Sequence, residues 1–361
     1  MQKRIADIAV VITGASSGIG KATALAFAAQ GARLALTARR GKQLEDTAAE
    51  CRNAGAEVVT QIADVADYPQ VEALGKRATN ALGGFDVWIN NAGMDVFGSF
   101  EQIPLKAFSR VIEINLMGTI HGAKVAMPHF RERGSGVLIN NASMVGACPT
   151  PFHSAYVASK FAIRGLSHSM SQELMDNPEI HVCTISPASI DTPLWQRGGN
   201  YSGRKVKPID PVYPPEQVAD IMVKLALQPR REVFAGAVAW MLAEQHSAAP
   251  DMTEDLMARF IPPSLFKSEP AVPSDGSLFE AKDDYGGTSG GWLSPNRPAI
   301  PASDMMNLFA APALLGAMPQ LYAWQLSCGL VEQFGRQFAN GGVWAWPPPA
   351  QPSWSDRPGA H

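Results

Sequence analysis

The chain has 361 residues, a formal net charge of -3, 46% hydrophobic residues and 17% charged residues. This length is enough to bury a full core, and the composition suits a soluble globular protein. The slight negative charge argues against a nucleic-acid partner, because binding a phosphate backbone requires a basic surface. The four cysteines, Cys51, Cys148, Cys183 and Cys328, are widely spaced, so we expect buried thiols in a cytoplasmic protein and no metal site.

Short apolar runs alternate with longer stretches of helical spacing up to about residue 190. The predicted strands are Ile8–Ile12, Arg33–Thr37, Glu57–Ile62, Asp86–Asn90, Gly136–Asn140 and His181–Ile185. Helical spacing occurs between them, as in Ala22–Gln30 and Val71–Leu82. This alternation predicts an α/β fold of the Rossmann type, a doubly wound parallel sheet that binds ligands beyond the carboxyl ends of its strands.

A helix over Pro215–Leu227 and a strand near Glu232–Ala235 are expected to complete the sheet. We therefore predict one dinucleotide-binding and catalytic domain over residues 1–245. Residues 246–361 are rich in proline, serine and glycine, which predicts an irregular, partly helical extension.

Within that extension, the stretch Met305–Val331 carries no charge and is long enough to cross a bilayer. Its prolines argue against a membrane-spanning helix. The alternatives are an interfacial or substrate-covering helix, or a segment that packs against the core or a second subunit.

The sequence TGASSGIG, residues 13–20, directly follows the first predicted strand. Glycines allow a backbone to approach a pyrophosphate, and the N-terminus of the following helix offers free N–H groups. A simple tight turn is the alternative, but the position between a strand and a helix favours a dinucleotide site. The predicted binding residues of this turn are Gly14, Ser16, Ser17, Gly18, Ile19 and Gly20.

Arg39 and Arg40 stand at the end of the second predicted strand, and no acidic residue occurs between Ala32 and Leu44. In an NAD site, an Asp or Glu at this place binds the ribose 2′-hydroxyl. A guanidinium instead pairs with a 2′-phosphate. The sequence therefore predicts NADP(H), with two solvated arginines as the alternative.

Further contacts to the cofactor are predicted at the ends of the next two strands. Asp64, followed by Val65, can accept a hydrogen bond from the adenine amino group. Asn91, Ala92 and Gly93 are small enough to leave room for adenosine. Each of these residues can also be explained as part of a turn.

Tyr156 and Lys160 are four residues apart, so on a helix both side chains emerge from one face. A phenol has a pKa near 10, and burial alone raises it further. One positive charge at about 4 Å supplies roughly 4 kcal/mol at an effective dielectric near 20, enough to bring the pKa toward neutrality. Ser143, after the fifth predicted strand, can hold a substrate oxygen beside the phenol.

Together, TGASSGIG, the NNAG at 90–93, Ser143 and the YVASK at 156–160 resemble the short-chain dehydrogenase/reductase family over about residues 5–240. The resemblance implies that Ser143 orients the substrate and that Tyr156 is the general acid/base. It implies that Lys160 lowers the tyrosine pKa and binds the nicotinamide ribose.

The same resemblance assigns roles to two further segments. Asn115 is expected to hold a water molecule in a proton relay. Pro187, Ile190 and Thr192 are expected to anchor the carboxamide, although Ala188 stands where the family has glycine. The implied reaction interconverts an alcohol and a ketone with NADP(H), in a homo-oligomer.

Residues 193–215 are expected to form a mobile loop over the substrate. The loop carries Trp195, Tyr201, Arg197, Arg204, Lys205 and Lys207. It is either a solvated loop or a lid that favours acidic or bulky substrates. Two other functions stay open: a non-catalytic NADP(H) sensor, and a reductase anchored to a membrane or partner through its tail.

Overall fold

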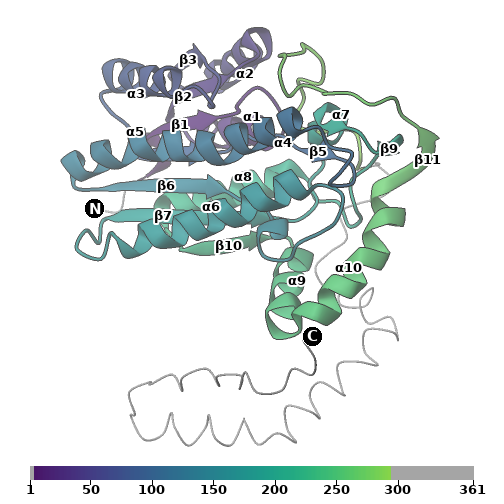
Figure 1. Cartoon of the computed structure of the whole chain (residues 1–361). Coiled ribbons are helices and arrows are strands. Elements are labelled where there is room, and N and C mark those ends of the chain that lie inside the picture. Colours follow the sequence, from purple (N-terminus) through teal and green to yellow (C-terminus); the bar gives the residue numbers. More distant parts are fainter. Residues whose placement is uncertain (1–3, 294–361) are drawn as a thin grey trace, which may run out of the picture. The chain divides into compact units, whose positions relative to one another are not determined.

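The structure, a computed structural model, describes residues 4–293 (Figure 1). Its centre is a parallel sheet of seven strands in the order β3-β2-β1-β4-β6-β7-β10. These strands are β1 (Ala9–Thr13), β2 (Arg33–Ala38), β3 (Val58–Ile62), β4 (Val87–Asn90), β6 (Gly136–Asn141), β7 (Ile180–Pro187) and β10 (Glu232–Ala235). The predicted doubly wound α/β fold is confirmed.

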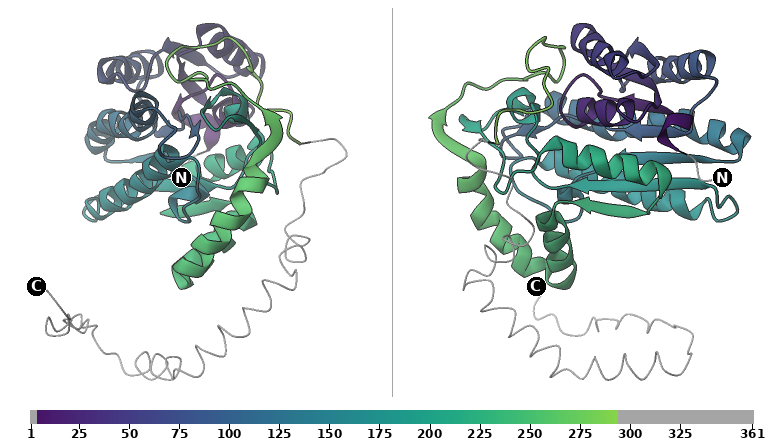
Figure 2. Two further views of the ribbon diagram at one scale, coloured as in Figure 1. Left: turned by 45° about the vertical axis from the view of Figure 1, so that its right-hand side comes forward. Right: turned by 180° about the vertical axis from the view of Figure 1, so that it is seen from behind.

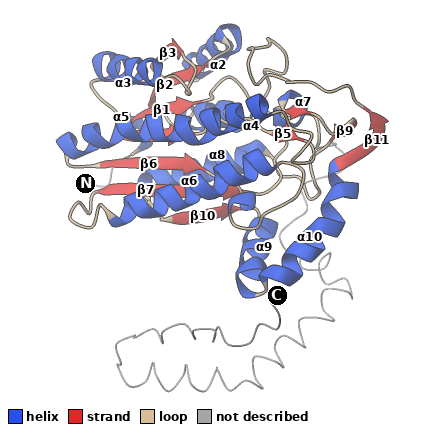
Figure 3. Cartoon of the chain, viewed as in Figure 1, coloured by secondary structure: helices blue, strands red, loops and turns tan. Residues whose placement is uncertain are grey.

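Helices cover both faces of this sheet (Figure 3). Helix α1 packs on α8 and α2 on one side, while α3 packs on α5 and α4 packs on α6 on the other. The larger helices are α1 (Gly18–Ala28), α2 (Gly41–Asn53), α3 (Tyr68–Leu82), α4 (Leu105–Ile112), α5 (Gly118–Arg133), α6 (Ser154–Gln172) and α8 (Pro215–Leu227). Because the sheet is covered on both faces, its inner strands are apolar runs without alternation, and all five residues of β1 are buried.

The chain after the last strand of the sheet contains more regular secondary structure than the predicted irregular extension. Helix α9 (Ala237–Ala248) is followed by α10 (Pro250–Leu265) and by strand β11 (Phe266–Pro270). Met257, Ile261 and Leu265 of α10 are buried in a second apolar cluster with Phe97 and Phe266. Residues up to 293 belong to the same compact unit as the sheet. The division of the chain at residue 245 stays a prediction.

Residues 193–215, predicted to be a loop, contain three short elements in the structure. They are helix α7 (Leu194–Arg197) and strands β8 (Gly199–Asn200) and β9 (Arg204–Val206). Strand β8 pairs with β5 (Val96–Phe97), and β9 pairs with β11 in antiparallel fashion. These pairings join segments that are far apart in the chain, so no local sequence pattern could predict them.

Several further predictions concern single residues or the tail. Cys51, Cys148 and Cys183 are buried free thiols, as predicted, and Cys328 lies outside the described residues. The uncharged stretch Met305–Val331 also lies outside them. In the part of the chain that the structure describes, no helix is both long and apolar enough to cross a membrane.

Candidate active site

The glycine-rich turn joins β1 to α1 at the carboxyl edge of the sheet. Gly14 has a φ of +71°, and a Cβ on it would lie 2.8 Å from the Cα of Ala92. A Cβ on Gly20 would lie 2.3 Å from the carbonyl oxygen of Gly14. Asn91 donates from Nδ2 to the carbonyl of Thr13 at 2.9 Å. The turn therefore packs directly on the end of β4, and only glycine fits at its two tightest positions.

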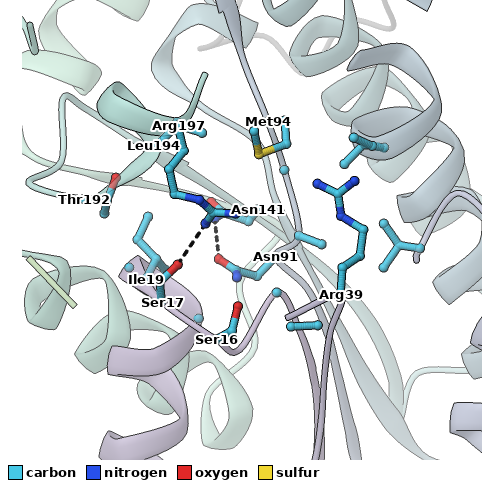
Figure 4. Close-up of a pocket in the computed structure, with 18 of the residues that line it drawn as sticks. Ser16, Ser17, Ile19, Arg39, Asn91, Met94, Asn141, Thr192, Leu194 and Arg197 are labelled. Atoms are coloured by element: carbon cyan, nitrogen blue, oxygen red, sulfur yellow. Dashed lines mark hydrogen bonds between the residues drawn. The ribbon is translucent and has the colours of Figure 1, made fainter. Parts of the chain in front are cut away.

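A pocket opens beside this turn, and it brings together most of the predicted site (Figure 4). The predicted residues that line it are Gly14, Ser16, Ser17, Gly18, Ile19, Gly20, Arg39, Arg40, Asp64, Val65, Asn91, Ala92, Gly93, Tyr156, Lys160 and Thr192. Lining residues that we did not predict are Ala38, Ala63, Met94, Ile114, Asn141, Pro193, Leu194 and Arg197.

Arg40 is almost fully buried, in contrast to the solvated side chain of the alternative reading. Its guanidinium donates to the hydroxyl of Ser16 at 3.0 Å and to that of Ser17 at 2.7 Å. Arg39 is also largely buried, and burial lowers the pKa of both arginines. Both guanidiniums thus line the pocket, and that of Arg40 is bonded directly to the glycine-rich turn.

Arg197 adds a third guanidinium from the opposite wall of the pocket. Figure 4 shows its side chain extending from α7 toward Ser17, to whose hydroxyl it donates at 3.3 Å. Burial, and after it the neighbouring positive charges of Arg40 and Arg39, lower the pKa of Arg197 to about 10. The sequence showed a basic residue in the 193–215 segment, but not that it points to the glycine-rich turn rather than to the substrate.

Asp64 lines the pocket, and its carboxylate is bound by other groups of the protein. It forms an ion pair with Arg110 of α4 and lies 3.8 Å from Arg39. One oxygen also accepts the backbone N–H of Ala66 at 3.0 Å. The carboxylate therefore holds α4 against the end of β3, and binding of an adenine amino group stays a prediction.

Tyr156 and Lys160 lie one turn apart on α6 and face the same pocket, as their spacing predicted. The ammonium of Lys160 lies 5.3 Å from the centre of the Tyr156 ring and donates to the carbonyl of Asn141 at 2.7 Å. Burial lowers the pKa of Lys160 to about 8. The lysine is thus fixed between the end of β6 and the phenol.

The pKa of Tyr156 is not lowered toward neutrality as expected; it is raised well above 10, first by burial and then by the negative charge of Asp95. A hydrogen bond with Ser143 acts in the opposite direction and lowers it. Ser143 is buried at the end of β6, where its Oγ accepts the backbone N–H of Val145 at 3.4 Å. The structure therefore places Ser143 in contact with Tyr156, while Tyr156 and Lys160 line the pocket and Ser143 does not.

Asn115 is fully buried in a π-helical turn, Glu113–Met117, between α4 and α5. Its side chain accepts from the N–H of Met94 at 2.8 Å and donates to the carbonyl of Met94 at 2.9 Å and the hydroxyl of Ser159 at 3.0 Å. Such turns occur frequently at functional sites. The side chain links the end of β4 to α6, and its part in a proton relay stays a prediction.

Two buried residues beside Tyr156 were not predicted from the sequence. Asp95 follows β4, and His153 precedes α6; Nδ1 of His153 lies 3.0 Å from Oδ2 of Asp95. The His153 ring stacks between those of Phe97 and Tyr156, with centroids 5.9 and 5.8 Å away. They were missed because they are far apart in the chain and belong to no motif that we recognised.

The segment after β7 differs in part from the expected arrangement. Thr192 lines the pocket, whereas Pro187 ends β7 and the carbonyl of Ile190 accepts the indole N–H of Trp195 at 3.0 Å. Ala188, in the place of the family's glycine, donates its N–H to Ala235 at 2.9 Å. Its φ is not positive, so the methyl group is accommodated without backbone strain.

Comparison with known proteins gives a consistent result. The model of a family described as short chain dehydrogenase matches residues 8–200. The chain is 31% identical over 322 residues to an uncharacterised oxidoreductase of Bacillus subtilis, YxnA, covering 85% of this chain and 90% of that relative. It is 33% identical over 242 residues to 3-ketodihydrosphingosine reductase of Bos taurus, covering 65% of this chain and 73% of that relative.

Solved structures show the same fold. An alcohol dehydrogenase of Thermococcus sibiricus complexed with 5-hydroxy-NADP has a TM-score of 0.55 and 30% identity, covering 63% of this chain and 95% of that chain. A short chain dehydrogenase/reductase of Burkholderia phymatum in complex with NAD has a TM-score of 0.62 and 24% identity, covering 68% and 95%. With a family match over more than half of its length and the predicted residues gathered in one pocket, the chain belongs to the short-chain dehydrogenase family of oxidoreductases.

Proposed function

We propose that this protein is an NADP(H)-dependent oxidoreductase that interconverts an alcohol and a carbonyl compound, with Tyr156 as the general acid/base. The observation that supports it best is one pocket with two chemically different ends. One end holds Tyr156 and Lys160, and the other holds Arg39, Arg40 and Arg197. A dinucleotide can extend from a proton-transfer group at one end of such a pocket to an anion site at the other.

The residues of the pocket fit a phosphorylated dinucleotide. Nε of Arg40 and Nε of Arg197 are buried donors without a hydrogen-bond partner within the described residues. Unpaired buried donors are rare in native proteins, so they point to a missing acceptor. The three guanidiniums also repel one another, which lowers the pKa of Arg197, and a phosphate would relieve that repulsion.

We assign the phosphates to two parts of this cluster. Arg39 and Arg40 follow β2, where an NAD-specific protein would carry an acid, and we place the 2′-phosphate there. Arg197 approaches the N-terminus of α1 through Ser17, and we place the pyrophosphate there. The relative complexed with 5-hydroxy-NADP supports a cofactor of the NADP type, whereas the NAD-bound neighbour shows only that the fold is shared.

When bound, the nicotinamide supplies or accepts the hydride, and the protein supplies the proton. For reduction, Ser143 holds the carbonyl oxygen and the Tyr156 hydroxyl donates a proton to it. Because the pKa of Tyr156 is raised, the phenol is protonated near neutral pH and ready to donate. The ammonium of Lys160, held at Asn141, stabilises the phenolate left after the transfer.

The experiment is a steady-state assay of NADPH oxidation with a panel of ketones and aldehydes, repeated with NADH. We expect turnover with NADPH, and a loss of several orders of magnitude in kcat for Tyr156→Phe with NADPH binding retained. A Phe variant that keeps more than a few per cent of wild-type kcat contradicts the role of Tyr156. Binding of NADPH without turnover of any carbonyl in wild type and variant alike would favour the sensor function instead.

A further inference from the structure

A segment of the C-terminal extension lies across the mouth of the cofactor pocket. This segment, residues 274–293, is called the strap below. It follows β11 and is drawn in Figure 1 as the light green loop that passes α7 and turns near α2. The view from behind in Figure 2 shows the same loop beside the ends of the sheet strands. No cofactor motif of the sequence falls within it.

One part of the strap contacts the arginine end of the pocket through backbone carbonyl groups. Arg39 donates to the carbonyls of Ser277 at 2.6 Å and Leu278 at 2.8 Å. Arg40 donates to the carbonyl of Asp284 at 2.6 Å. The strap carbonyls therefore help to orient both guanidiniums, and Arg40 is held in addition by the hydroxyls of Ser16 and Ser17.

The strap also reaches the first turn of α1 and the start of α2. The N–H of Gly18 donates to the carbonyl of Gly287 at 3.0 Å. Nε2 of Gln43 donates to the carbonyl of Asp283 at 2.9 Å. The strap thus contacts both the N-terminus of α1, where we place the pyrophosphate, and the start of α2, which follows the arginines where we place the 2′-phosphate.

The other part of the strap is fastened to the opposite wall at Asp191, a fully buried carboxylate. Asp191 accepts from the hydroxyl of Ser289 at 2.6 Å and from the N–H groups of Gly290 and Trp292, both at 2.9 Å. Gln196 of the same wall donates to the carbonyl of Gly290 at 2.6 Å. Charged acceptors make stronger hydrogen bonds than neutral ones, so this is the firmest attachment of the strap.

These contacts join two walls that the pocket separates. Arg39, Arg40 and Gly18 belong to the β1–α2 wall, and Asp191 and Gln196 belong to the β7–α7 wall. A chain segment bonded to both walls closes the space between them. A dinucleotide in the pocket would lie beneath it.

The contacts of the strap differ from those of an inhibitor that imitates a phosphate. An inhibitory segment of that kind would place carboxylates in contact with the guanidiniums. The side chains of Asp283 and Asp284 are exposed instead, and neither forms an ion pair within the described residues. Their charges act on Arg40 only at longer range, where they raise its pKa against the larger effect of burial. Carbonyl groups are neutral, so they orient Arg39 and Arg40 without cancelling the positive charge that a phosphate requires.

We propose that the strap is part of the cofactor site: it closes over bound NADP(H) and holds it, so that the cofactor leaves only when the strap detaches from Asp191. This inference rests on the proposed NADP(H)-dependent function. It adds that residues 274–293, outside the matched family region 8–200, control the rate of cofactor exchange.

Gly290 and Gly291 provide a matched pair of full-length variants. A Cβ on Gly290 would lie 2.5 Å from the carbonyl oxygen of Thr192 and 2.6 Å from the indole nitrogen of Trp292, so Gly290→Ala pushes the strap off its wall. A Cβ on Gly291 would meet nothing within 4 Å. Its φ of +79° is one that asparagine tolerates, so Gly291→Asn is the control. Trp292→Ala weakens the same attachment without inserting an atom, since it removes the hydrogen bond that the indole N–H donates to Oε1 of Gln196 at 3.3 Å.

The measurement is the dissociation rate of NADPH, followed by the loss of its fluorescence when the complex is chased with excess NADP, together with an equilibrium titration. We expect Gly290→Ala to release NADPH at least about tenfold faster than wild type and to bind it more weakly. The release rate of Trp292→Ala should lie between those of wild type and Gly290→Ala. The release rate of Gly291→Asn should match that of wild type.

Two results would overturn the proposal. Equal dissociation rates in all four proteins would show that the strap does not retain the cofactor. Tighter binding in Gly290→Ala would show that the strap competes with it. If wild type binds NADH as well as NADPH, the proposed cofactor preference is wrong, and the strap is then judged by the release of NADH in the same chase.

Discussion

Nδ1 of His153 lies 3.0 Å from a carboxylate oxygen of Asp95, and the same imidazole stacks on the ring of Tyr156. Both partners are buried, and burial raises the pKa of Asp95. The charge of Asp95 in turn raises the pKa of Tyr156 and that of Lys160. A carboxyl group held by a histidine therefore influences both groups that move or stabilise the proton.

The first prediction concerns Asp95→Asn, which keeps an oxygen for His153 and removes only the charge. Without that charge the pKa values of Tyr156 and Lys160 both fall, because Asp95 raises each of them. In carbonyl reduction, which needs a protonated Tyr156, the alkaline limb of log kcat/KM should move to lower pH by about half a unit or more. In alcohol oxidation the acid limb should move in the same direction.

The measurement is the pH profile of kcat/KM in both directions for wild type and variant. A purely structural role for Asp95 would lower activity at every pH and leave the limbs in place. A shift toward higher pH would contradict the sign of the interaction.

The second prediction uses the lowered pKa of Lys160, which is about 8, whereas an ordinary lysine has a pKa of 10.5. Folding disfavours the protonated lysine, so this penalty is fully present below pH 8. Between pH 8 and 10.5 the unfolded chain binds more protons, and the penalty is relieved as pH rises. The difference of about 2.5 units corresponds to about 3 kcal/mol, an order-of-magnitude figure.

Lys160→Met removes the titrating group while keeping an unbranched side chain. From pH 7.5 to 10, the free energy of unfolding of wild type should therefore rise relative to that of the variant, by up to about 3 kcal/mol. Urea unfolding of both proteins at several pH values checks this. A constant difference across the range would mean that burial does not lower the pKa of Lys160.

The sheet and the core of the site were predictable because their signals are local. Parallel strands covered on both faces are continuous apolar runs, and β1, β2 and β6 lie where such runs were found. Tyr156 and Lys160 share a helix, so their spacing alone predicted that both side chains emerge from one face of it. Arg39 and Arg40 follow a predicted strand, whose carboxyl end lies at the binding edge of any doubly wound sheet.

The strap and the Asp95–His153 pair could not be predicted in this way. The strap is bonded mainly through its own backbone groups, which every residue type supplies, so its sequence shows no pattern. Asp95 and His153 meet across 58 positions of the chain. The direction of Arg197 depends on α7, whose four residues carry no helical periodicity. Each of these features is fixed by tertiary contacts alone.

The third prediction separates Asn90 from its neighbour Asn91 in the NNAG sequence. The buried amide of Asn90 accepts from the indole N–H of Trp88 at 2.8 Å and donates to Asn140 at 2.9 Å. Asn90→Ala leaves those two buried groups without a partner, so it should lower the free energy of unfolding by roughly 2–3 kcal/mol. The exposed Asn80 in α3 is a control, and Asn80→Ala should change stability by less than about 0.5 kcal/mol. Equal effects in urea unfolding would contradict a structural network at Asn90.

The last prediction distinguishes the two phosphate assignments by comparing Arg39→Ala with Arg197→Ala. Removing one charge-assisted contact should cost about 1.5–3 kcal/mol, or roughly ten- to a hundredfold in affinity. If Arg39 binds the 2′-phosphate, its loss weakens NADPH and leaves NADH almost unchanged, because NADH lacks that group. If Arg197 binds the pyrophosphate from its position at Ser17, its loss weakens both cofactors by a similar factor.

Fluorescence titration of wild type and both variants with NADPH and NADH gives the six affinities needed. Since Arg39 also donates to the strap carbonyls at Ser277 and Leu278, its variant is compared with Gly290→Ala, which loosens the strap and keeps the guanidinium. A loosened strap should weaken both cofactors, whereas a lost phosphate contact should weaken NADPH alone. An Arg39→Ala variant that loses NADH and NADPH equally would therefore place this arginine with the strap and not with the 2′-phosphate.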